Sequence, residues 1–216
     1  MNKVEQSLWI EANYPLSGLG RPRDPLYGTC INDAAYVTNP TINGKMELDP
    51  AYVCWMRMLE RANSIKFQDK CTTYIGVTVC NEWRSFISFR KWWLDHYREG
   101  CELDKDLLVV GNREYGYNSC IYVPGWLNRF TCDSRKKRGD FPIGVSLYKP
   151  RWKFMSKCHN PITGKRKTIG YFDTPAAAHA AWLKYKLSLA NQLKPQMDDI
   201  DKRIYPNVVT IIKAAR

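Results

Sequence analysis

The 216-residue sequence predicts an α+β fold in two domains, and three observations support that prediction. Apolar residues recur at helical spacing in the first half, short β-rich runs separated by Pro, Gly and Asn follow, and an alanine-rich run begins near residue 175. The chain is 44% hydrophobic and 25% charged, which is typical of a folded protein and excludes a disordered or coiled-coil chain. We expect a strand-strand-helix domain, followed by a three-stranded antiparallel sheet packed on one helix.

The first 96 residues predict an arm and two helices. Residues 1–45 are rich in Pro, Gly and Asn with little periodicity, so we expect an arm held against the next domain by its aromatic residues. Asp49 and Pro50 predict a helix start, because Asp caps a helix and Pro fits its first turn. A second helix is predicted over residues 83–96. The expected core positions of these helices are Tyr52, Trp55, Met56, Leu59, Phe86, Phe89, Trp92 and Trp93.

Residues 103–130 change character and predict a strand, a loop, a second strand and a short helix. The segment has an apolar and acidic start, a polar turn around Asn112, a β-rich run over 120–123 closed by Pro124, and a short helix through Trp126. This is the order of a ββα unit. We therefore place one domain, with its preceding helices, at residues 46–132, and a basic linker at residues 133–140.

Residues 141–194 predict the second domain. Three strands are expected over 143–147, 152–157 and 167–172, joined by turns at Lys149-Pro150 and at 160–164. Thr174 and Pro175 predict the start of a helix. Residues 195–216 form a C-terminal tail to which we assign no role. The side chains expected to face the sheet are Ala177, Ala181, Tyr185 and Leu189, and the aromatic residues expected in the core are Trp152, Phe172 and Trp182.

The net charge of +12 is concentrated in the C-terminal part of the chain. Residues 1–130 contain 15 basic and 15 acidic side chains, whereas positions 135–186 contain 13 basic residues against Asp140 and Asp173. A single charge run indicates a solvated surface, but here basic and aromatic residues alternate in strand-like segments. A membrane-binding helix would instead need its lysines beside a helical apolar stripe. The pattern therefore indicates a nucleic-acid partner.

No run approaches the length of a membrane helix and the N-terminus lacks the layout of a signal peptide, so we expect a protein of the cytoplasm with no membrane partner. The eight cysteines are scattered without a Cys-x-x-Cys pair. We expect them to be reduced thiols, several of them buried as small hydrophobic residues, and a structural metal or disulfide is the alternative.

Part of the C-terminal region resembles a known DNA-binding domain. Gly144-Val145, Trp152, Lys165-Arg166 and the run from Ile169 to Thr174 before an alanine-rich helix resemble the AP2-type domain of plant transcription factors and phage endonucleases, over about residues 141–191. The resemblance implies a sheet whose exposed side chains enter the major groove of double-stranded DNA. The first two strands contain fewer arginines than the plant pattern, so no base specificity is carried over. With the basic linker and turns, the candidate DNA-binding residues are Arg135, Lys136, Lys137, Arg138, Lys149, Arg151, Lys153, Lys157, Lys165, Arg166 and Lys167.

The preceding region resembles phage HNH endonucleases that often carry an AP2 domain. The matching pieces occur in order between Tyr27 and Asn128: Gly28 to Asp33, Tyr52 to Arg61, Gly76 to Trp83, Leu103 to Asp106 and Gly111 to Arg113. The resemblance implies a hydrolase with a ββα-metal site, similar to freestanding homing or nicking enzymes. In such a site one divalent cation stabilises the scissile phosphate and a histidine activates water.

Asp104, Lys105, Asp106 and Asn112 are the catalytic candidates that this resemblance implies, and Asp104 and Asn128 are the metal candidates. Carboxylates suit Mg²⁺ or Mn²⁺. However, Lys105 stands where the common motif has histidine, and His96, His159 and His179 lie elsewhere in the sequence. Because two aspartates flank Lys105 and favour its charged form, we expect it to contact phosphate or pair with a charge rather than act as a base.

Two hypotheses follow. In the first, the chain is a metal-dependent endonuclease or nickase in which Asp106 or a metal-bound water takes the proton. In the second, a degenerate ββα module and the basic domain bind DNA without cleaving it, in regulation or interference with a host. A third alternative is that the acidic residues Asp104 and Asp106 have a purely structural role. No organic cofactor and no small-molecule substrate are expected.

Overall fold

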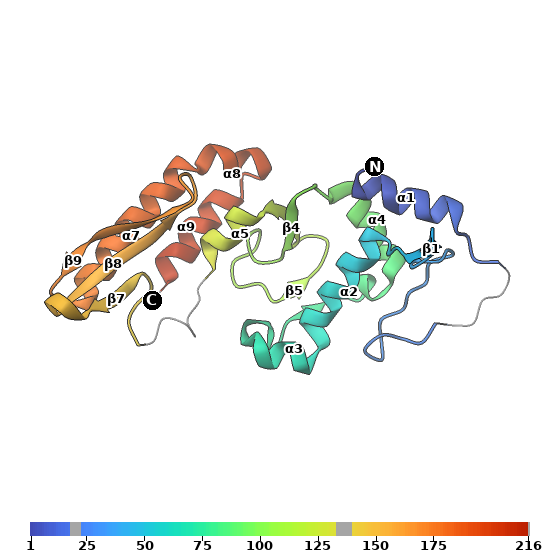
Figure 1. Ribbon diagram of the computed structural model, residues 1–216, viewed down its shortest axis with the longest axis horizontal. Coiled ribbons are helices and arrows are strands. Elements are labelled where there is room, and N and C mark those ends of the chain that lie inside the picture. The colour runs from blue at the N-terminus through green and yellow to red at the C-terminus, as the bar shows by residue number, and fades with distance from the viewer. Residues whose placement is uncertain (18–22, 133–139, 216) are drawn as a thin grey trace. The chain divides into compact units, whose positions relative to one another are not determined.

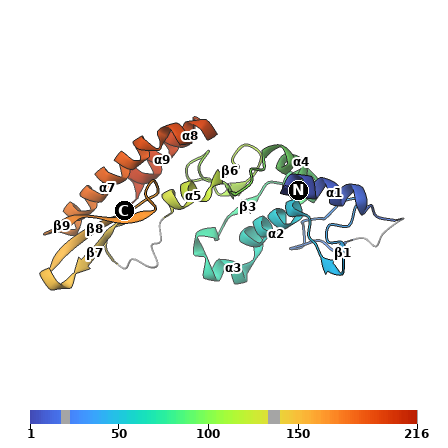
Figure 2. The ribbon, with the colours of Figure 1, turned by 45° about the horizontal axis from the view of Figure 1, so that its top comes forward.

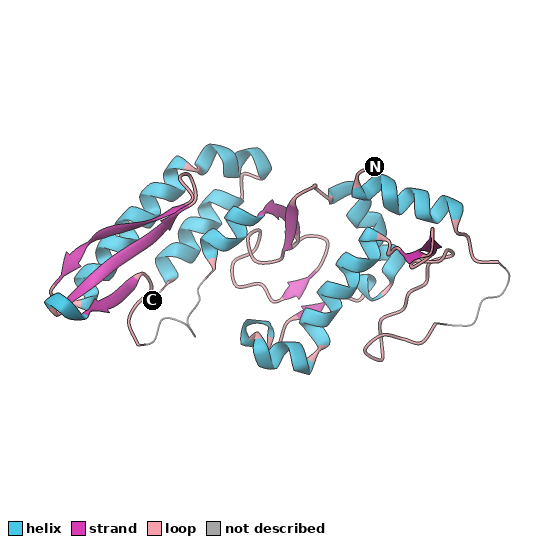
Figure 3. Cartoon of the chain, viewed as in Figure 1, coloured by secondary structure: helices cyan, strands magenta, loops and turns pink. Residues whose placement is uncertain are grey.

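The computed structural model describes residues 1–17, 23–132 and 140–215, which fall into two compact units (Figure 1). The first comprises Met1–Asp106 and Gly111–Tyr122, and the second comprises Leu107–Val110 and Val123–Arg216. Helices and small sheets occur in both (Figure 3), which confirms the α+β class. Among the described residues, no helix is long and apolar enough to span a membrane.

The described part of the first unit contains four α-helices and two 3-10 turns. The predicted helices are present as α2 and α4, and α1 is a helix that the sequence patterns did not predict. Asn2 caps α1, because its side chain accepts from the Glu5 amide while the Glu5 carboxylate accepts from the Asn2 amide. The bounds are α1 (Lys3–Asn13), α2 (Pro50–Asn63), α3 (Ile65–Lys70), α4 (Phe86–His96), η1 (Thr72–Tyr74) and η2 (Glu82–Arg84).

Helices α2 and α4 build the core of this unit with the side chains that helical spacing predicts. Trp55, Phe86, Phe89 and Trp93 are fully buried. Trp55 also donates a hydrogen bond from its indole nitrogen to the Trp83 carbonyl oxygen at 2.7 Å, so burial leaves this polar atom satisfied. Such rings contribute more buried apolar area than any other side chains.

A buried polar network ties residues of the first 45 to this core. Asp49 caps α2 through the Ala51 amide at 2.7 Å, as its place before Pro50 predicts. Its other carboxylate oxygen accepts from the Tyr36 hydroxyl and lies 3.7 Å from the Arg90 guanidinium. Arg90 is the counter-charge of the buried Asp49, and Arg90 also pairs with the Glu11 carboxylate of α1 at 2.9 Å.

Residues between 41 and 124 also form three short strand pairs. β1 (Thr41–Ile42) pairs antiparallel with β2 (Lys45–Met46), and β3 (Thr78–Val79) pairs parallel with β5 (Glu114–Tyr115). β4 (Cys101–Asp104) pairs with β6 (Ile121–Pro124), which leads into α5 (Gly125–Thr131). The strand, loop, strand and helix predicted for residues 103–130 are therefore present in the predicted order.

The second unit contains an antiparallel sheet of order β7-β8-β9. Its strands are β7 (Val145–Tyr148), β8 (Lys153–Asn160) and β9 (Lys165–Phe172), and the 3-10 turn η3 (Lys149–Arg151) joins the first two. The predicted turn after β8 is stabilised by the Asn160 side chain, which accepts from the Ile162 amide at 2.9 Å. The register of β8 with β9 shifts once, between Ser156 and Lys157.

Helix α7 (Pro175–Gln192) covers one face of this sheet, as both ribbon views show (Figure 2). Thr174 caps it through the Ala177 amide at 3.1 Å, as predicted. Its buried side chains are Ala178, Trp182, Lys186, Leu189 and Ala190. Of the predicted contacts with the sheet, Leu189 is buried and the Tyr185 hydroxyl accepts a hydrogen bond from Asn160 of β8. The prediction was wrong for Ala177, which is exposed, because the helix turns the larger Trp182 toward the sheet.

Residues of the C-terminal tail form two further helices of the second unit. α8 (Lys194–Ile200) and α9 (Ile204–Ala214) bury Met197, Ile204, Val208 and Ile212. The Asn207 amide donates to the carbonyl oxygens of Leu107 and Leu108 at 2.9 Å each, which fixes the short segment 107–110 to α9.

All eight cysteines lie in the described part of the chain, and none of them forms a disulfide. Cys30, Cys120 and Cys158 are buried. Burial raises the pKa of Cys80 to about 11, which keeps this thiol protonated at neutral pH.

Candidate nucleic-acid interface

The two faces of the β7-β8-β9 sheet differ in what they contact. Ser156 and Cys158 are buried on the face toward α7, and the Asn160 amide donates to the Tyr185 hydroxyl of α7 at 3.1 Å. Because successive side chains of a strand point to opposite faces, Lys157 and His159 point away from α7, and both are exposed. The pairing register extends this assignment to the other strands.

We call the face opposite α7 the open face. It displays basic, aromatic and small polar side chains from all three strands, and no acidic residue occurs among its strand positions. A surface of this composition attracts a polyanion and offers hydrogen-bond donors to it. The side chains of the open face are Ser146 and Tyr148 on β7, Lys153, Met155, Lys157 and His159 on β8, and Arg166, Thr168 and Tyr171 on β9.

An aromatic corner lies at the η3 end of the open face. The Tyr148 and Tyr171 rings are 5.0 Å apart, and the Arg151 guanidinium lies 5.7 Å from the Tyr171 ring centroid. Beside them, Trp152 has φ +48° and is 76% exposed. The expectation that Trp152 belongs to the core was wrong, because the left-handed backbone at this position turns the indole toward solvent.

The structure separates the predicted DNA-binding residues into groups. Arg151, Lys153, Lys157 and Arg166 belong to the open face or its corner, and Lys149 is exposed in η3. Lys153 is paired with Asp173. Lys165 and Lys167 alternate with Arg166 and lie on the α7 side, where the Lys167 ammonium is 4.8 Å from the Tyr185 ring centroid. The predicted residues Arg135, Lys136, Lys137 and Arg138 fall outside the described residues.

In the first unit, Asn112 organises the loop that follows Asp104. Its amide nitrogen donates to the Lys105 carbonyl oxygen at 2.8 Å and to the Glu114 carbonyl oxygen at 2.6 Å, and its oxygen accepts from the Glu114 amide at 3.3 Å. Asp104 accepts from the Asp106 amide at 2.8 Å. One amide side chain thus closes the loop, so the structure gives Asn112 a role in holding the turn.

Lys105 is buried inside this loop, with 9% of its side chain exposed. Its ammonium contacts the Asp106 carboxylate and lies 3.4 Å from the Asn112 carbonyl oxygen. Of the two expected roles, this geometry favours the charge partner, because a phosphate contact needs an ammonium that a polyanion can reach.

No three His, Cys, Asp or Glu side chains among the described residues are grouped to hold an ion. The Asp106 carboxylate is neutralised by Lys105. Asn128 lies on α5 in the second unit and Asp104 in the first, so their predicted convergence on one ion stays a prediction.

The three histidines have distinct surroundings. The His96 ring stacks on Trp92, and its Nδ1 lies 2.8 Å from the Trp92 carbonyl oxygen. The Nδ1 of His179 lies 3.0 Å from the Ile143 carbonyl oxygen. His159 is the histidine exposed on the open face, where it alternates with Lys157.

The candidate DNA-binding residues predicted from the sequence did not include Trp152, His159 and Tyr171. A signal for His159 was present, because strict alternation through residues 153–160 places it on the same face as Lys157. No signal indicated the exposure of Trp152, since the left-handed turn that exposes it has no glycine. No protein-family model, curated protein or solved structure matches the chain.

Proposed function

We propose that this protein binds double-stranded DNA through the open face of the β7-β8-β9 sheet. The observation that carries the proposal is the grouping of Arg151, Lys157 and Arg166 on the face that α7 leaves uncovered. Lysine and arginine neutralise phosphates, and the planar arginine side chain also forms bidentate hydrogen bonds to guanine in the major groove.

The sheet has features that support docking into a groove. A narrow antiparallel sheet fits the major groove of B-form DNA, and its backing helix keeps the exposed side chains in register. The Arg151 guanidinium stacks near Tyr171, which holds a flexible side chain in one region before binding. The resemblance of residues 141–191 to AP2-type domains adds to this argument.

The test compares two double variants that remove equal charge from opposite faces of the same strands. In Lys157→Ala/Arg166→Ala the open face loses two cations, and in Lys165→Ala/Lys167→Ala the α7 side loses two. We expect the first variant to weaken binding of a mixed-sequence DNA duplex about tenfold or more, and the second to weaken it much less. Fluorescence anisotropy at fixed salt measures both. Equal losses would show attraction by net charge alone and would remove the assignment to the open face.

The second candidate function is metal-dependent DNA cleavage at the loop of Asp104–Asn112. The loop closed by Asn112 directly after β4 favours this candidate, since it holds Asp104 and Asp106 in one conformation. If a Mg²⁺ or Mn²⁺ ion binds, its chemistry would be stabilisation of negative charge on the scissile phosphate. What this chain supplies is the oxygen ligand Asp104 and the rigid loop behind it.

Supercoiled plasmid with Mg²⁺ or Mn²⁺ tests this second candidate. We expect the wild-type protein to produce relaxed plasmid and Asp104→Ala to lose that activity, while DNA affinity through the sheet is unchanged. Equal backgrounds for the two proteins would eliminate cleavage and leave a DNA-binding protein, which is the alternative hypothesis.

A further inference from the structure

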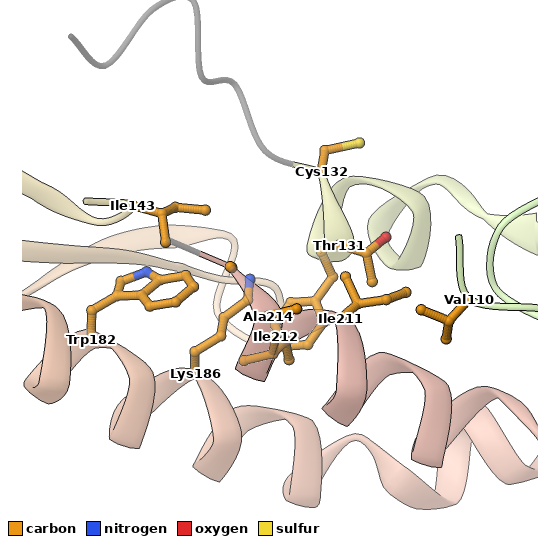
Figure 4. Close-up of a pocket in the computed structure, with 11 residues that line it drawn as sticks. Val110, Thr131, Cys132, Ile143, Trp182, Lys186, Ile211, Ile212 and Ala214 are labelled. Carbon is orange, nitrogen blue, oxygen red and sulfur yellow. The ribbon is translucent and has the colours of Figure 1, made fainter. Parts of the chain in front are cut away.

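The second unit contains a cavity of about 280 Å³ behind the sheet (Figure 4). Figure 4 shows Trp182 and Lys186 rising from α7 toward the segment that carries Ile143, with α9 beside them. The lining is apolar apart from one ammonium and a few small polar groups at the rim. The other lining residues are Val110, Phe130, Thr131, Cys132, Ile211, Ile212, Ala214 and Ala215.

Lys186 is the charged residue among the described residues of this lining. It is buried with 9% exposed, and its ammonium lies 3.6 Å from the Phe130 ring centroid. No carboxylate among the described residues forms an ion pair with it. The titratable groups near it are the thiols of Cys158 and Cys132. Burial lowers the pKa of Lys186 to about 8, with these two thiols acting in the opposite direction.

A buried ammonium without a carboxylate is costly for the folded state. An aromatic ring compensates part of the lost hydration of the cation, but an anion in hydrogen-bond contact compensates far more. Structural lysines in apolar surroundings are almost always paired. Lys184, two residues earlier on α7, is exposed to solvent and needs no such partner.

We propose that this cavity binds a small, mainly apolar molecule with a single carboxylate, whose charge pairs with Lys186. The apolar walls contributed by Ile143, Trp182 and Ile211 would hold the hydrocarbon part, and the ammonium would fix the orientation of the acid. The volume lies near the lower end of the range for small-molecule sites, which limits the ligand to a short or medium chain. This proposal does not depend on DNA binding.

Isothermal titration calorimetry with octanoate as the probe tests the proposal on the full chain. We expect saturable binding with one site, and affinity reduced about tenfold or more in Lys186→Met, which keeps the length of the side chain and removes its charge. Lys184→Met, on the same helix but exposed, should bind octanoate as the wild type does. Octanol should bind the wild-type protein more weakly than octanoate does. Its affinity should be the same for Lys186→Met and for the wild-type protein, because octanol has no charge to pair with Lys186.

A second variant, Ile211→Trp, fills the cavity and should abolish binding of both probes. Thermal unfolding of each variant confirms that the fold is kept, and octanoate should raise the Tm of the wild-type protein but not that of Ile211→Trp. Absence of saturable binding, or equal octanoate affinity in Lys186→Met and wild type, would overturn the proposal. So would unchanged octanoate binding in Ile211→Trp, because the site would then lie elsewhere.

Discussion

The Asn112 side chain forms hydrogen bonds with three backbone groups of one loop, so a single residue holds this loop closed. The loop contains two carboxylates, Asp104 and Asp106, and one ammonium, Lys105. The distances between these charges depend on the conformation of the loop. The Asn112 amide is bonded to the Lys105 and Glu114 carbonyl oxygens, and these bonds hold the loop closed.

We predict that Asn112→Ala lowers the free energy of unfolding by about 1–3 kcal/mol, because the Lys105 carbonyl oxygen loses its donor and the Glu114 carbonyl oxygen keeps only the Ser119 hydroxyl. Urea denaturation measures this change, and hydrogen exchange should show faster opening of the amides between 105 and 114. Asn118→Ala is the matched control, since Asn118 is exposed in the same region. Equal effects of the two substitutions would show that the loop does not depend on Asn112.

Trp152 and Trp182 show that the residue type alone does not decide whether a side chain is buried. Both were expected in the core, yet Trp182 is 4% exposed and Trp152 is 76% exposed. Composition and spacing treat the two indoles alike. The difference arises because Trp182 belongs to a helix facing the sheet, while Trp152 follows a 3-10 turn in a left-handed conformation.

At the scale of secondary structure, the contact between β7 and α7 depends on a glycine. Gly144 precedes β7 with φ +81°, and a Cβ atom there would lie 2.1 Å from the Trp182 ring. The close approach explains why Trp182 can cover this end of the sheet. Gly164, in the turn between β8 and β9, also has a positive φ but has open space around it.

We predict that Gly144→Ala destabilises the second unit more than Gly164→Ala does. Both substitutions impose a left-handed conformation on alanine, which costs about 1 kcal/mol. Only Gly144→Ala adds an overlap with Trp182, which costs about 1–3 kcal/mol more when the core cannot relax. Thermal unfolding followed by tryptophan fluorescence compares them, and equal shifts in Tm would contradict the predicted overlap.

The positions of the helices and strands can be predicted from neighbouring residues, but the side of each helix that is buried cannot. Thr174, Pro175 and Asp49 mark helix starts where the structure has them, because caps and first turns depend on neighbouring residues. Of the α7 side chains predicted to face the sheet, Leu189 is buried and Tyr185 contacts β8, but Ala177 is exposed. Alanines occur on several sides of this helix, so periodicity is weak, and the gain from burying the larger Trp182 decides the orientation.

At the scale of the whole molecule, charge is distributed unevenly between the first 130 residues and the rest. The excess of 12 positive charges belongs to residues 131–216, which include the sheet and its open face. Since counterion release depends on the cations that contact phosphate, the salt dependence of DNA binding should originate from that part of the chain.

We predict that Lys157→Ala/Arg166→Ala lowers the slope of log affinity against log salt concentration by about 2, because each cation that contacts a phosphate contributes about 1. Lys66→Ala/Lys70→Ala removes two exposed cations of α3 and should leave the slope unchanged. Anisotropy titrations between low and physiological salt give both slopes. The same decrease in both variants would contradict a localised interface.

The sequence by itself determined the α+β class, the main helix starts, the three strands of the basic domain and the concentration of positive charge, because caps, turns, periodicity and charge are local properties. Only the tertiary structure decided which lysines share the open face, that Lys105 pairs with Asp106 inside its loop, and that Lys186 faces an apolar cavity. These facts depend on strand register and on packing between residues far apart in the chain, where a shift of one position moves a side chain to the opposite face.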